Sequence, residues 1–326
     1  KRCDQKRSGR CWMFASLNTM RTRIIERYNL KTYELSQAYP LFYDKVEKSN
    51  WFFENILDTL DEPLDGRLMA HLLADPISDG GQWDMFRALV EKYGVCPKEA
   101  MPETACSSNT QEMDRYLTRY LRGAAKRLRE SHAAGVGADD LRAMKKEMMG
   151  EVTSLLITCL GEPPQSFDVR VRDKDDDLVL TGTYTPQEFF KKVVDMPVAD
   201  YVSIISAPTA DKPFGHTYTV SRLGNVVEAG GVRYLNLPID RLKSIAIAQL
   251  QAGLPVWFGC DVAQSYISKE GIMDTAALDV DGLFGFPVEG CMSRAERLDY
   301  GESLMTHAMV LEGVNLDAEG KPTLWK

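Results

Sequence analysis

The sequence predicts an α+β fold, with a helical part followed by a β-rich part. Up to about residue 160, apolar side chains recur every three or four residues, which is the spacing of one helix face. From Phe167 onward, short runs alternate between apolar and polar side chains and are separated by turn residues, as strands are. The 326 residues, 44% of them hydrophobic, are enough for a large core in one large domain or two subdomains.

Three helical stretches are expected in the first 110 residues. The first covers residues 11 to about 28, where apolar side chains follow helical spacing, and the second covers the aromatic-rich residues 36–55. Gly80 and Gly81 interrupt this pattern. A third helix is expected at 83–93, and Gly94 ends it.

Residues 110–160 form another long helical region, with no turn signal before Gly135 and Gly137. Between Arg115 and Gly150 it carries nine Lys or Arg against four acidic residues. A basic helix can bind nucleic acid, but it is more often a solvated face or a subunit contact. The net charge of −8 and the pI near 5.2 argue against a general nucleic-acid binder, so we favour the second interpretation.

The β-rich part is expected to begin with a hairpin, in which 168–172 and 178–184 alternate around an acidic turn. The turn begins like a calcium loop, but Leu178 stands where that loop needs glycine and Tyr184 where it needs glutamate, so no metal site is expected. Further strands are expected at 201–205, 216–222, 256–260 and 308–314. We therefore predict a helical subdomain at 1–110, a helical insertion at 111–165 and a β-rich subdomain at 166–326.

Cys11 is the candidate nucleophile. It lies six residues after Gln5 and opens the first apolar, helix-periodic run. A helix amino terminus favours the thiolate, which is the reactive form of cysteine. The Gln5 amide and the Cys11 N–H could then hold an oxyanion formed by attack on a carbonyl. The alternative is that Cys11 is a small buried core residue.

His307 is the candidate base among only four histidines, because it begins a strand-like segment. His71 and His132 lie in helical, charged surroundings, and His216 is the second candidate. A single histidine is more often a hydrogen-bonded structural residue. Paired with a thiol at a helix start, however, His307 is better explained as a general base and acid.

Several segments in the same order resemble the papain-like cysteine peptidases, in particular the bleomycin hydrolase and aminopeptidase C family. The segments are Gln5-x5-Cys11-Trp12, Gly80-Gly81-Gln82-Trp83-Asp84-Met85, Tyr93-Gly94-Val95-Cys96-Pro97-Lys98, Leu223-Gly224-Asn225-Val226-Val227, Tyr234-Leu235-Asn236-Leu237-Pro238 and His307-Ala308. The resemblance implies a papain-like fold, in which a helical subdomain and a barrel-like β-rich subdomain flank the active-site cleft. It also implies that Gly80, Gly81 and Ala308 bind substrate.

The resemblance further implies an intracellular aminopeptidase that acts on peptides through a Cys11–His307 thiolate-imidazolium pair, without a metal or cofactor. Similar proteins assemble as hexamers, so a homo-oligomer is expected. Two alternatives stay open. One is another Cys-His acyl-transfer enzyme, such as an amidase or transferase, and the other is a non-catalytic oligomer that binds nucleic acid.

The cysteines favour a reducing compartment. Secreted papain relatives usually carry a disulfide cysteine three positions before the nucleophile, where this chain has Ser8. The seven cysteines are an odd number and include no C-x-x-C pair. No apolar run approaches the roughly 20 residues of a membrane span. We therefore expect a cytoplasmic protein with no membrane partner.

One part of the family's catalytic set is absent from the sequence. The family orients its histidine with an asparagine about twenty residues further on, and here residues 322–326 are expected to be a strand that stops before that position. We expect the chain to be cut in that strand. The family's carboxyl terminus also restricts the cleft to aminopeptidase action, so this specificity rests on the resemblance alone.

Overall fold

The computed structural model describes residues 4–288 and 290–326, and these form two compact units. The first unit contains residues 4–200 and Val220–Val232, and the second contains Tyr201–Thr219 and Arg233–Lys326. The chain thus enters the second unit, returns to the first, and finishes in the second. The three subdomains expected from the sequence stay a prediction.

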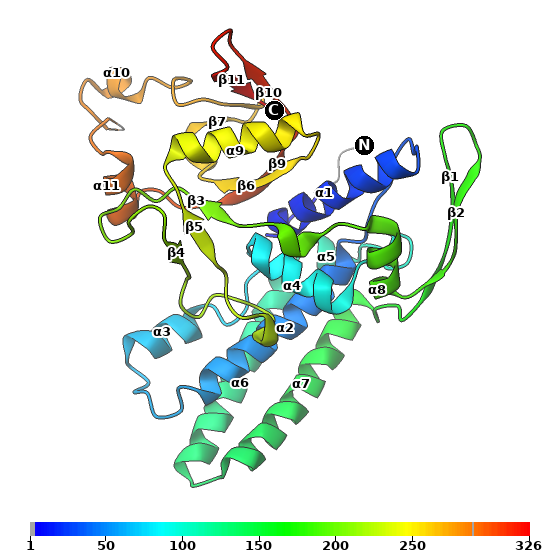
Figure 1. Ribbon diagram of the computed structural model, residues 1–326. Helices are drawn as coiled ribbons and strands as arrows, with labels where there is room; N and C mark the ends of the chain where they lie inside the picture. The colour runs from blue at the N-terminus through cyan, green and yellow to red at the C-terminus, as the bar shows by residue number, and fades with distance from the viewer. Residues whose placement is uncertain (1–3, 289) are drawn as a thin grey trace. The chain divides into compact units, whose positions relative to one another are not determined.

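The first unit is mainly helical (Figure 1). Its helices are α1 (Cys11–Arg27), α2 (Ala38–Leu57), α3 (Arg67–Ala74), α4 (Trp83–Tyr93), α5 (Ala105–Ser108), α6 (Gln111–Ala133), α7 (Ala138–Leu160) and α8 (Pro186–Phe189). A π-helical turn at Phe190–Val194 continues α8, and short 3₁₀ turns follow at Val198–Asp200 and Val227–Ala229. The expected helices at 11–28 and 83–93 are therefore present, and each begins at the expected residue.

Helix α1 buries one face because its apolar side chains recur at helical spacing. Leu17, Met20 and Ile24 on this face are at most 2% exposed. Helix α2 differs, since it buries charged side chains as well as aromatic ones. Asp44, Lys45 and Lys48 are all buried in its middle. A buried charge requires a partner: Asp44 and Lys48 bind each other, and Lys45 binds Asp79 and Asp114.

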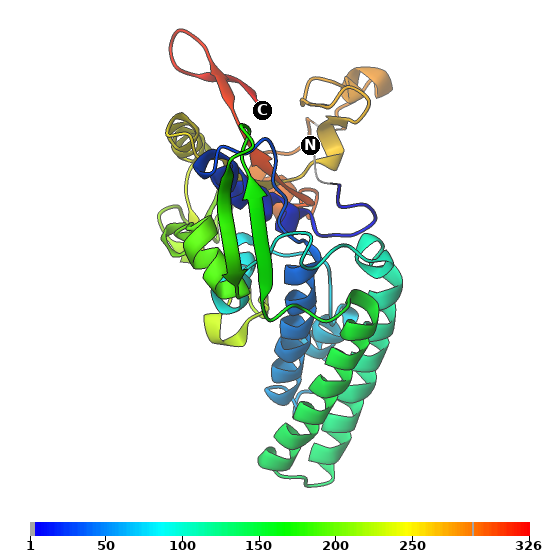
Figure 2. The same ribbon diagram turned by 90° about the vertical axis from the view of Figure 1, so that its right-hand side faces the viewer.

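Helices α6 and α7 form an antiparallel pair beside α2 (Figure 2). The chain turns between them at residues 134–137, where Gly135 has a φ of +88°. Much of the basic charge of this region is used in contacts within the first unit. Arg122 donates to the carbonyl of Leu73, Arg129 donates to the carbonyl of Thr59, and Arg142 and Lys145 both bind Glu54.

Strands β1 (Phe167–Arg172) and β2 (Leu178–Tyr184) form the expected antiparallel hairpin, which is seen along its length in Figure 2. One carboxylate oxygen of Asp173 accepts hydrogen bonds from the backbone N–H groups of Asp175 and Asp177, at 2.9 and 3.0 Å. The acidic turn of the hairpin is thus closed by hydrogen bonds between the Asp173 side chain and the backbone of the turn.

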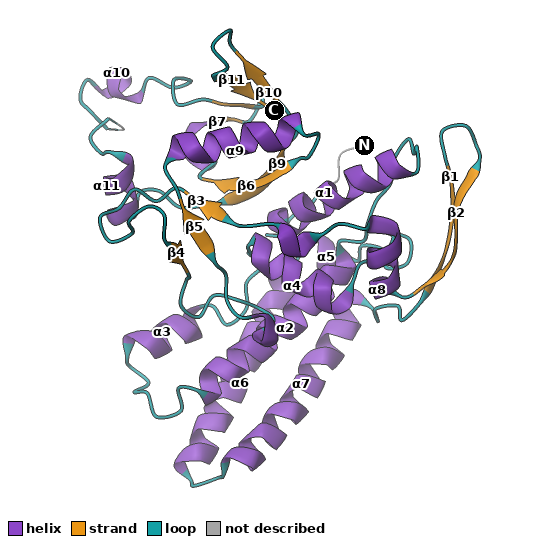
Figure 3. Ribbon diagram, in the orientation of Figure 1, coloured by secondary structure: helices purple, strands orange, loops and turns teal. Residues whose placement is uncertain are grey.

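The second unit contains short strands in separate small sheets (Figure 3). Its elements are β3 (Ile204–Ile205), β4 (Thr217–Tyr218), β5 (Tyr234–Asn236), α9 (Ile239–Gln251), β6 (Val256–Cys260), β7 (Tyr266–Ile267), β8 (Ile272–Met273), α10 (Val280–Phe284), α11 (Arg294–Asp299), β9 (His307–Leu311), β10 (Val314–Leu316) and β11 (Pro322–Trp325). Strand β5 pairs parallel with β3 and antiparallel with β4. The other pairs, β6–β9, β7–β8 and β10–β11, are antiparallel.

The described strands do not close into a barrel, so the barrel-like layout expected from the sequence takes the form of these small sheets. The strands expected at 201–205 and 216–222 are shorter than predicted, since only Ile204–Ile205 and Thr217–Tyr218 pair. The second one ends at Tyr218, and the chain turns shortly after it, with a φ of +61° at Arg222. Across residues 4–288 and 290–326, no helix combines the length and the hydropathy that crossing a bilayer requires.

Candidate active site

Cys11 is the first residue of α1 and is half-buried. The backbone N–H groups of Met13 and Phe14 both bind the carbonyl of Arg10 at 3.0 Å, so the helix begins immediately before the cysteine. The positive end of the helix dipole lies at this first turn, where it stabilises negative charge. The alternative that Cys11 is a fully buried core residue does not fit its partial exposure.

Gln5 lies in a turn just before the helix. Its amide nitrogen donates to the carbonyl of Ser8 at 2.9 Å, and the Ser8 hydroxyl donates back to the carbonyl of Gln5 at 2.7 Å. An amide nitrogen carries two hydrogens, and the bond to Ser8 uses one of them. Ser8 is therefore a hydrogen-bonding residue at the position where secreted papain relatives carry a disulfide cysteine.

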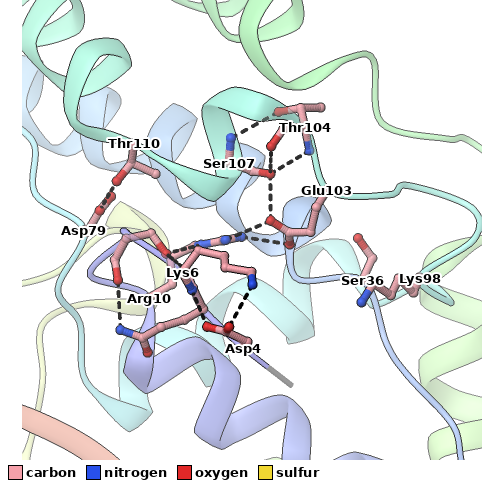
Figure 4. Close-up of polar contacts among 12 residues, drawn as sticks. Asp4, Lys6, Arg10, Ser36, Asp79, Lys98, Glu103, Thr104, Ser107 and Thr110 are labelled. Atoms are coloured by element: carbon pink, nitrogen blue, oxygen red, sulfur yellow. Dashed lines mark hydrogen bonds and ion pairs between the residues drawn. The ribbon is translucent and has the colours of Figure 1, made fainter. Parts of the chain in front are cut away.

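Arg10 anchors the start of α1 through an ion pair that no local sequence pattern predicts (Figure 4). Its guanidinium is 1% exposed and binds both carboxylate oxygens of Glu103, at 3.0 and 2.8 Å. Glu103 also accepts a hydrogen bond from Ser107 at 2.7 Å. Thr104 and Ser107 form a capping box at the start of α5, and Thr104, a residue type favoured at helix N-caps, was a usable sequence signal for that turn.

The Gly80–Gly81 segment lies against the residue that follows the nucleophile. A Cβ atom added to Gly81 would lie 2.5 Å from the Trp12 ring, whereas one added to Gly80 would meet nothing within 4 Å. The Trp12 indole also donates a 2.6 Å hydrogen bond to the carbonyl of Asp79. Gly81 is thus required by packing, and Gly80 leaves its backbone open on the side where a side chain would stand.

His307 is the first residue of β9, where it lies opposite Cys260 on β6. The backbone N–H of Thr306, the residue before His307, donates to the carbonyl of Cys260 at 3.1 Å. The pairing of β9 with β6 therefore fixes the backbone at His307. Burial lowers the pKa of His307 below its ordinary value of 6.5. Ala308 follows it, 8% exposed and opposite Gly259.

The other histidines lie elsewhere. His71 is exposed on α3, and His132 near the end of α6 binds the exposed Asp61 at 2.8 Å. His216, the second candidate base, is exposed in the loop before β4.

The structure groups the site residues by unit. Gln5, Cys11, Gly80 and Gly81 belong to the first unit, and His307 and Ala308 belong to the second. The contacts through Trp12 and Asp79 bring the Cys11 and Gly80–Gly81 segments together. The pairing of Cys11 with His307 stays a prediction.

No disulfide joins the six cysteines that the structure describes, and Cys3 lies outside the described residues. Burial raises the pKa of the Cys96 thiol to about 12 and that of Cys159 to about 11, so neither is a ready nucleophile. Within 4–288 and 290–326, no cluster of three or more His, Cys, Asp or Glu side chains has the arrangement of a metal site.

Comparisons with known proteins agree over nearly the whole chain. The family described as "Peptidase C1-like family" matches this chain over residues 1–326. Aminopeptidase C of Streptococcus thermophilus is 50% identical over 323 residues, which are 99% of this chain and 72% of the relative. Bleomycin hydrolase of Gallus gallus is 41% identical over 316 residues, which are 96% of this chain and 69% of the relative.

A crystal structure of PepW from Lactobacillus rhamnosis HN001 has the same fold as this chain, with a TM-score of 0.95 and 53% identity. The likeness covers 99% of this chain and 72% of that one. These matches confirm the resemblance seen in the sequence and the papain-like α+β fold class. The chain therefore belongs to the Peptidase C1-like family.

Proposed function

We propose that this chain removes N-terminal residues from peptides, with Cys11 as the nucleophile and His307 as the general base and acid. The predicted enzyme class, a cysteine-type aminopeptidase, is confirmed by the family match and by the similarity to Aminopeptidase C. The roles of the individual residues are our proposal. It rests chiefly on the position of Cys11 as the first residue of a 17-residue helix.

The proposed reaction has two steps. The Cys11 thiolate attacks the scissile carbonyl carbon, and the oxyanion is held by the Gln5 amide and the Cys11 N–H. His307 gives its proton to the leaving amine as the C–N bond breaks, which leaves a thioester on Cys11. His307 then takes a proton from water as the water attacks the thioester. The C–S bond breaks, the carboxylic acid leaves, and Cys11 returns to the thiolate beside the protonated His307.

The surroundings of His307 explain why the two groups would act as a pair. Burial disfavours the imidazolium, and on its own it lowers the pKa of His307. A thiolate within a few ångströms favours the imidazolium and opposes this effect. We therefore infer that His307 is protonated at neutral pH only where the Cys11 thiolate accompanies it.

Gly80, Gly81 and Ala308 are proposed to bind the substrate. The open side of Gly80 gives an extended peptide room to approach the backbone, as in strand addition. Ala308 offers a small side chain directly after the proposed base. On this proposal, the substrate backbone lies along the Gly80–Gly81 segment.

We also propose that the enzyme is cytoplasmic and forms a homo-oligomer, a hexamer by resemblance. The hydrogen bonds of Ser8 support the first proposal, because they hold the turn before Cys11 where secreted relatives use a disulfide. Light scattering of the purified protein tests the second one, and a monomer at micromolar concentration would contradict it.

The nucleic-acid alternative is less well supported by the basic segment. Arg122 and Arg129 donate to backbone carbonyls of the first unit, and Arg142 and Lys145 bind Glu54. These contacts occupy side chains that a polyanion would need. Salt-sensitive DNA binding that survives Cys11→Ala would favour the alternative.

Hydrolysis of fluorogenic aminoacyl amides by wild type, Cys11→Ser and Cys291→Ser tests the proposal. Cys291 is exposed and lies outside the proposed site, so its variant is the matched control. We expect Cys11→Ser to lose at least about 1,000-fold in kcat/KM and Cys291→Ser to keep wild-type activity. Full activity in Cys11→Ser would contradict the proposal. Transfer of the aminoacyl group to an added amine in preference to water would indicate a transferase.

A further inference from the structure

Three consecutive backbone carbonyls just before Gly81 are held from within the first unit. The carbonyl of Ser78 accepts from the ammonium groups of Lys45 and Lys48, at 3.1 and 2.8 Å. The carbonyl of Asp79 accepts from the Trp12 indole at 2.6 Å, and that of Gly80 accepts from Lys48 at 2.6 Å. The loop is thus held by buried side chains at each of these carbonyls.

The carboxylate of Asp79 holds the chain just before the nucleophile Cys11. One oxygen accepts from the backbone N–H of Gly9 at 2.9 Å and from the Thr110 hydroxyl, and the other binds Lys45 at 2.7 Å. A Cβ on Gly9 would lie 2.6 Å from the Cβ of Asp79, so the two chains can approach this closely only at a glycine. Through Gly9 and Trp12, Asp79 contacts the chain on both sides of Cys11.

The charged side chains that hold residues 78–80 are buried and paired with carboxylates. The Lys45 side chain is 0% exposed and also binds Asp114 at 2.8 Å, and the Lys48 side chain, 7% exposed, binds Asp44 at 2.8 Å. Burial would raise the pKa of Asp79, but Lys45 outweighs burial and holds that pKa below its ordinary value. An ionised Asp79 is therefore the stable form in this cluster, and removal of its charge leaves Lys45 poorly compensated.

We propose that Asp79 is a positioning residue, which fixes the Gly80–Gly81 segment against the start of α1 so that the substrate-binding backbone and the nucleophile keep one alignment. Asp79 acts through Gly9 and Trp12 and does not need to touch the substrate. This role rests on the proposed function, because Asp79 would maintain the alignment of nucleophile and substrate that the Cys11 reaction requires.

The test compares Asp79→Asn with Asp114→Asn in the full chain. Both variants replace a carboxylate on Lys45 by an amide of the same size. Asp114 shares Lys45 and a side-chain hydrogen bond with Asp79, but among the hydrogen bonds and ion pairs of the described residues it has no contact with Gly9 or Trp12. Burial raises the pKa of Asp114 to about 7, so its neutral form is already populated at neutral pH. Asp114→Asn is therefore a matched control.

Three quantities are measured for each variant at a temperature well below its own midpoint of unfolding. They are kcat/KM for an aminoacyl amide, the rate of Cys11 alkylation by iodoacetamide, and amide hydrogen exchange at residues 5–14 and 78–82. For Asp79→Asn we expect at least about a tenfold loss in kcat/KM, faster exchange in both segments, and alkylation within about threefold of wild type. For Asp114→Asn we expect kcat/KM within about twofold and unchanged exchange.

Equal exchange and equal kcat/KM in the two variants would overturn the proposal for Asp79. Faster exchange in Asp79→Asn with undiminished kcat/KM would also overturn it, since the contact would then be structural only. Lys48→Met is the second variant, because it removes the donor to Ser78 and Gly80 while leaving Asp79 ionised. It should raise KM more than it lowers kcat. An inactive wild type would contradict the proposed function instead, and the exchange data would still decide whether Asp79 holds the two segments together.

Discussion

The indole of Trp12 donates a hydrogen bond to the backbone carbonyl of Asp79 at 2.6 Å, so the residue after the proposed nucleophile is tied to the residue before Gly80. The same ring fills the space where a Gly81 side chain would stand. One aromatic side chain thus joins the start of α1 to the proposed substrate-binding segment. This contact holds the Cys11 and Gly80–Gly81 segments close together in the fold, although they lie about 70 residues apart in the chain.

Gly81→Ala should destabilise the protein, because the new Cβ would overlap the buried Trp12 ring at 2.5 Å. Overpacking of this kind costs about 1–3 kcal/mol of unfolding free energy. Gly80→Ala is the control, since its Cβ would meet nothing within 4 Å. Urea denaturation measures both variants, and equal midpoints would show that the Trp12 contact does not constrain residue 81.

Arg10→Met should cost about 2–4 kcal/mol, because it leaves the Glu103 carboxylate without its bidentate partner at a largely buried position. The exposed pair of Lys126 and Glu130 provides the comparison, and Lys126→Met should change stability by less than about 0.5 kcal/mol. Denaturant unfolding gives both values. A loss at Arg10 no larger than that at Lys126 would mean that the buried pair does not anchor the start of α1.

Asp114 should make the protein less stable as the pH rises from about 4 to 7. Burial raises the pKa of Asp114 from 3.8 to about 7 in the folded state, while Lys45 opposes the shift and Asp79 adds to it. Between these values the folded state binds more protons at this carboxyl than the unfolded state does, so the unfolding free energy falls with rising pH. Asp114→Asn removes this titration. The variant should gain about 1 kcal/mol or more relative to wild type between pH 5 and pH 8. A constant difference between the two proteins over this range would contradict the prediction.

The pKa of His307 should depend on Cys11. In Cys11→Ala, burial alone acts on the imidazole, and its pKa should lie below 6.5. In wild type, the accompanying thiolate should raise it above that value. Proton NMR titration can follow the few histidines of this chain, with His307→Gln used to assign the resonance. The same pKa in both proteins would show that the two residues do not interact.

The sequence predicted the elements that carry a local pattern. Periodic apolar residues predicted α1 and α4, and the glycines at 135 and 137 predicted the turn between α6 and α7. The hairpin of β1 and β2 followed from alternation around an acidic turn. Cys11 and His307 could be proposed because a thiol at a helix start and a histidine at a strand start are local features.

The polar contacts that align the site could not be predicted in this way. Arg10 and Glu103 are 93 residues apart, and Lys45 and Asp79 are 34 apart, so no periodic pattern joins the members of either pair. No local pattern in the sequence marks Lys45 as buried, yet its side chain is 0% exposed and binds both Asp79 and Asp114. The lengths of the strands expected at 201–205 and 216–222 were overestimated, because propensity alone does not show where pairing stops, whereas the strand expected at 256–260 is present with those bounds.

We propose that Cys11 is a thiolate activated by His307, and the pH dependence of Cys11 alkylation is the most direct test of this pairing. Peptide mass spectrometry would follow iodoacetamide labelling of Cys11 in wild type and in His307→Ala, with the buried Cys96 thiol as an internal reference. We expect rapid labelling of the wild type down to about pH 5, and in His307→Ala a rate that rises only towards the ordinary thiol pKa of about 8.5. Identical pH profiles in the two proteins would contradict it.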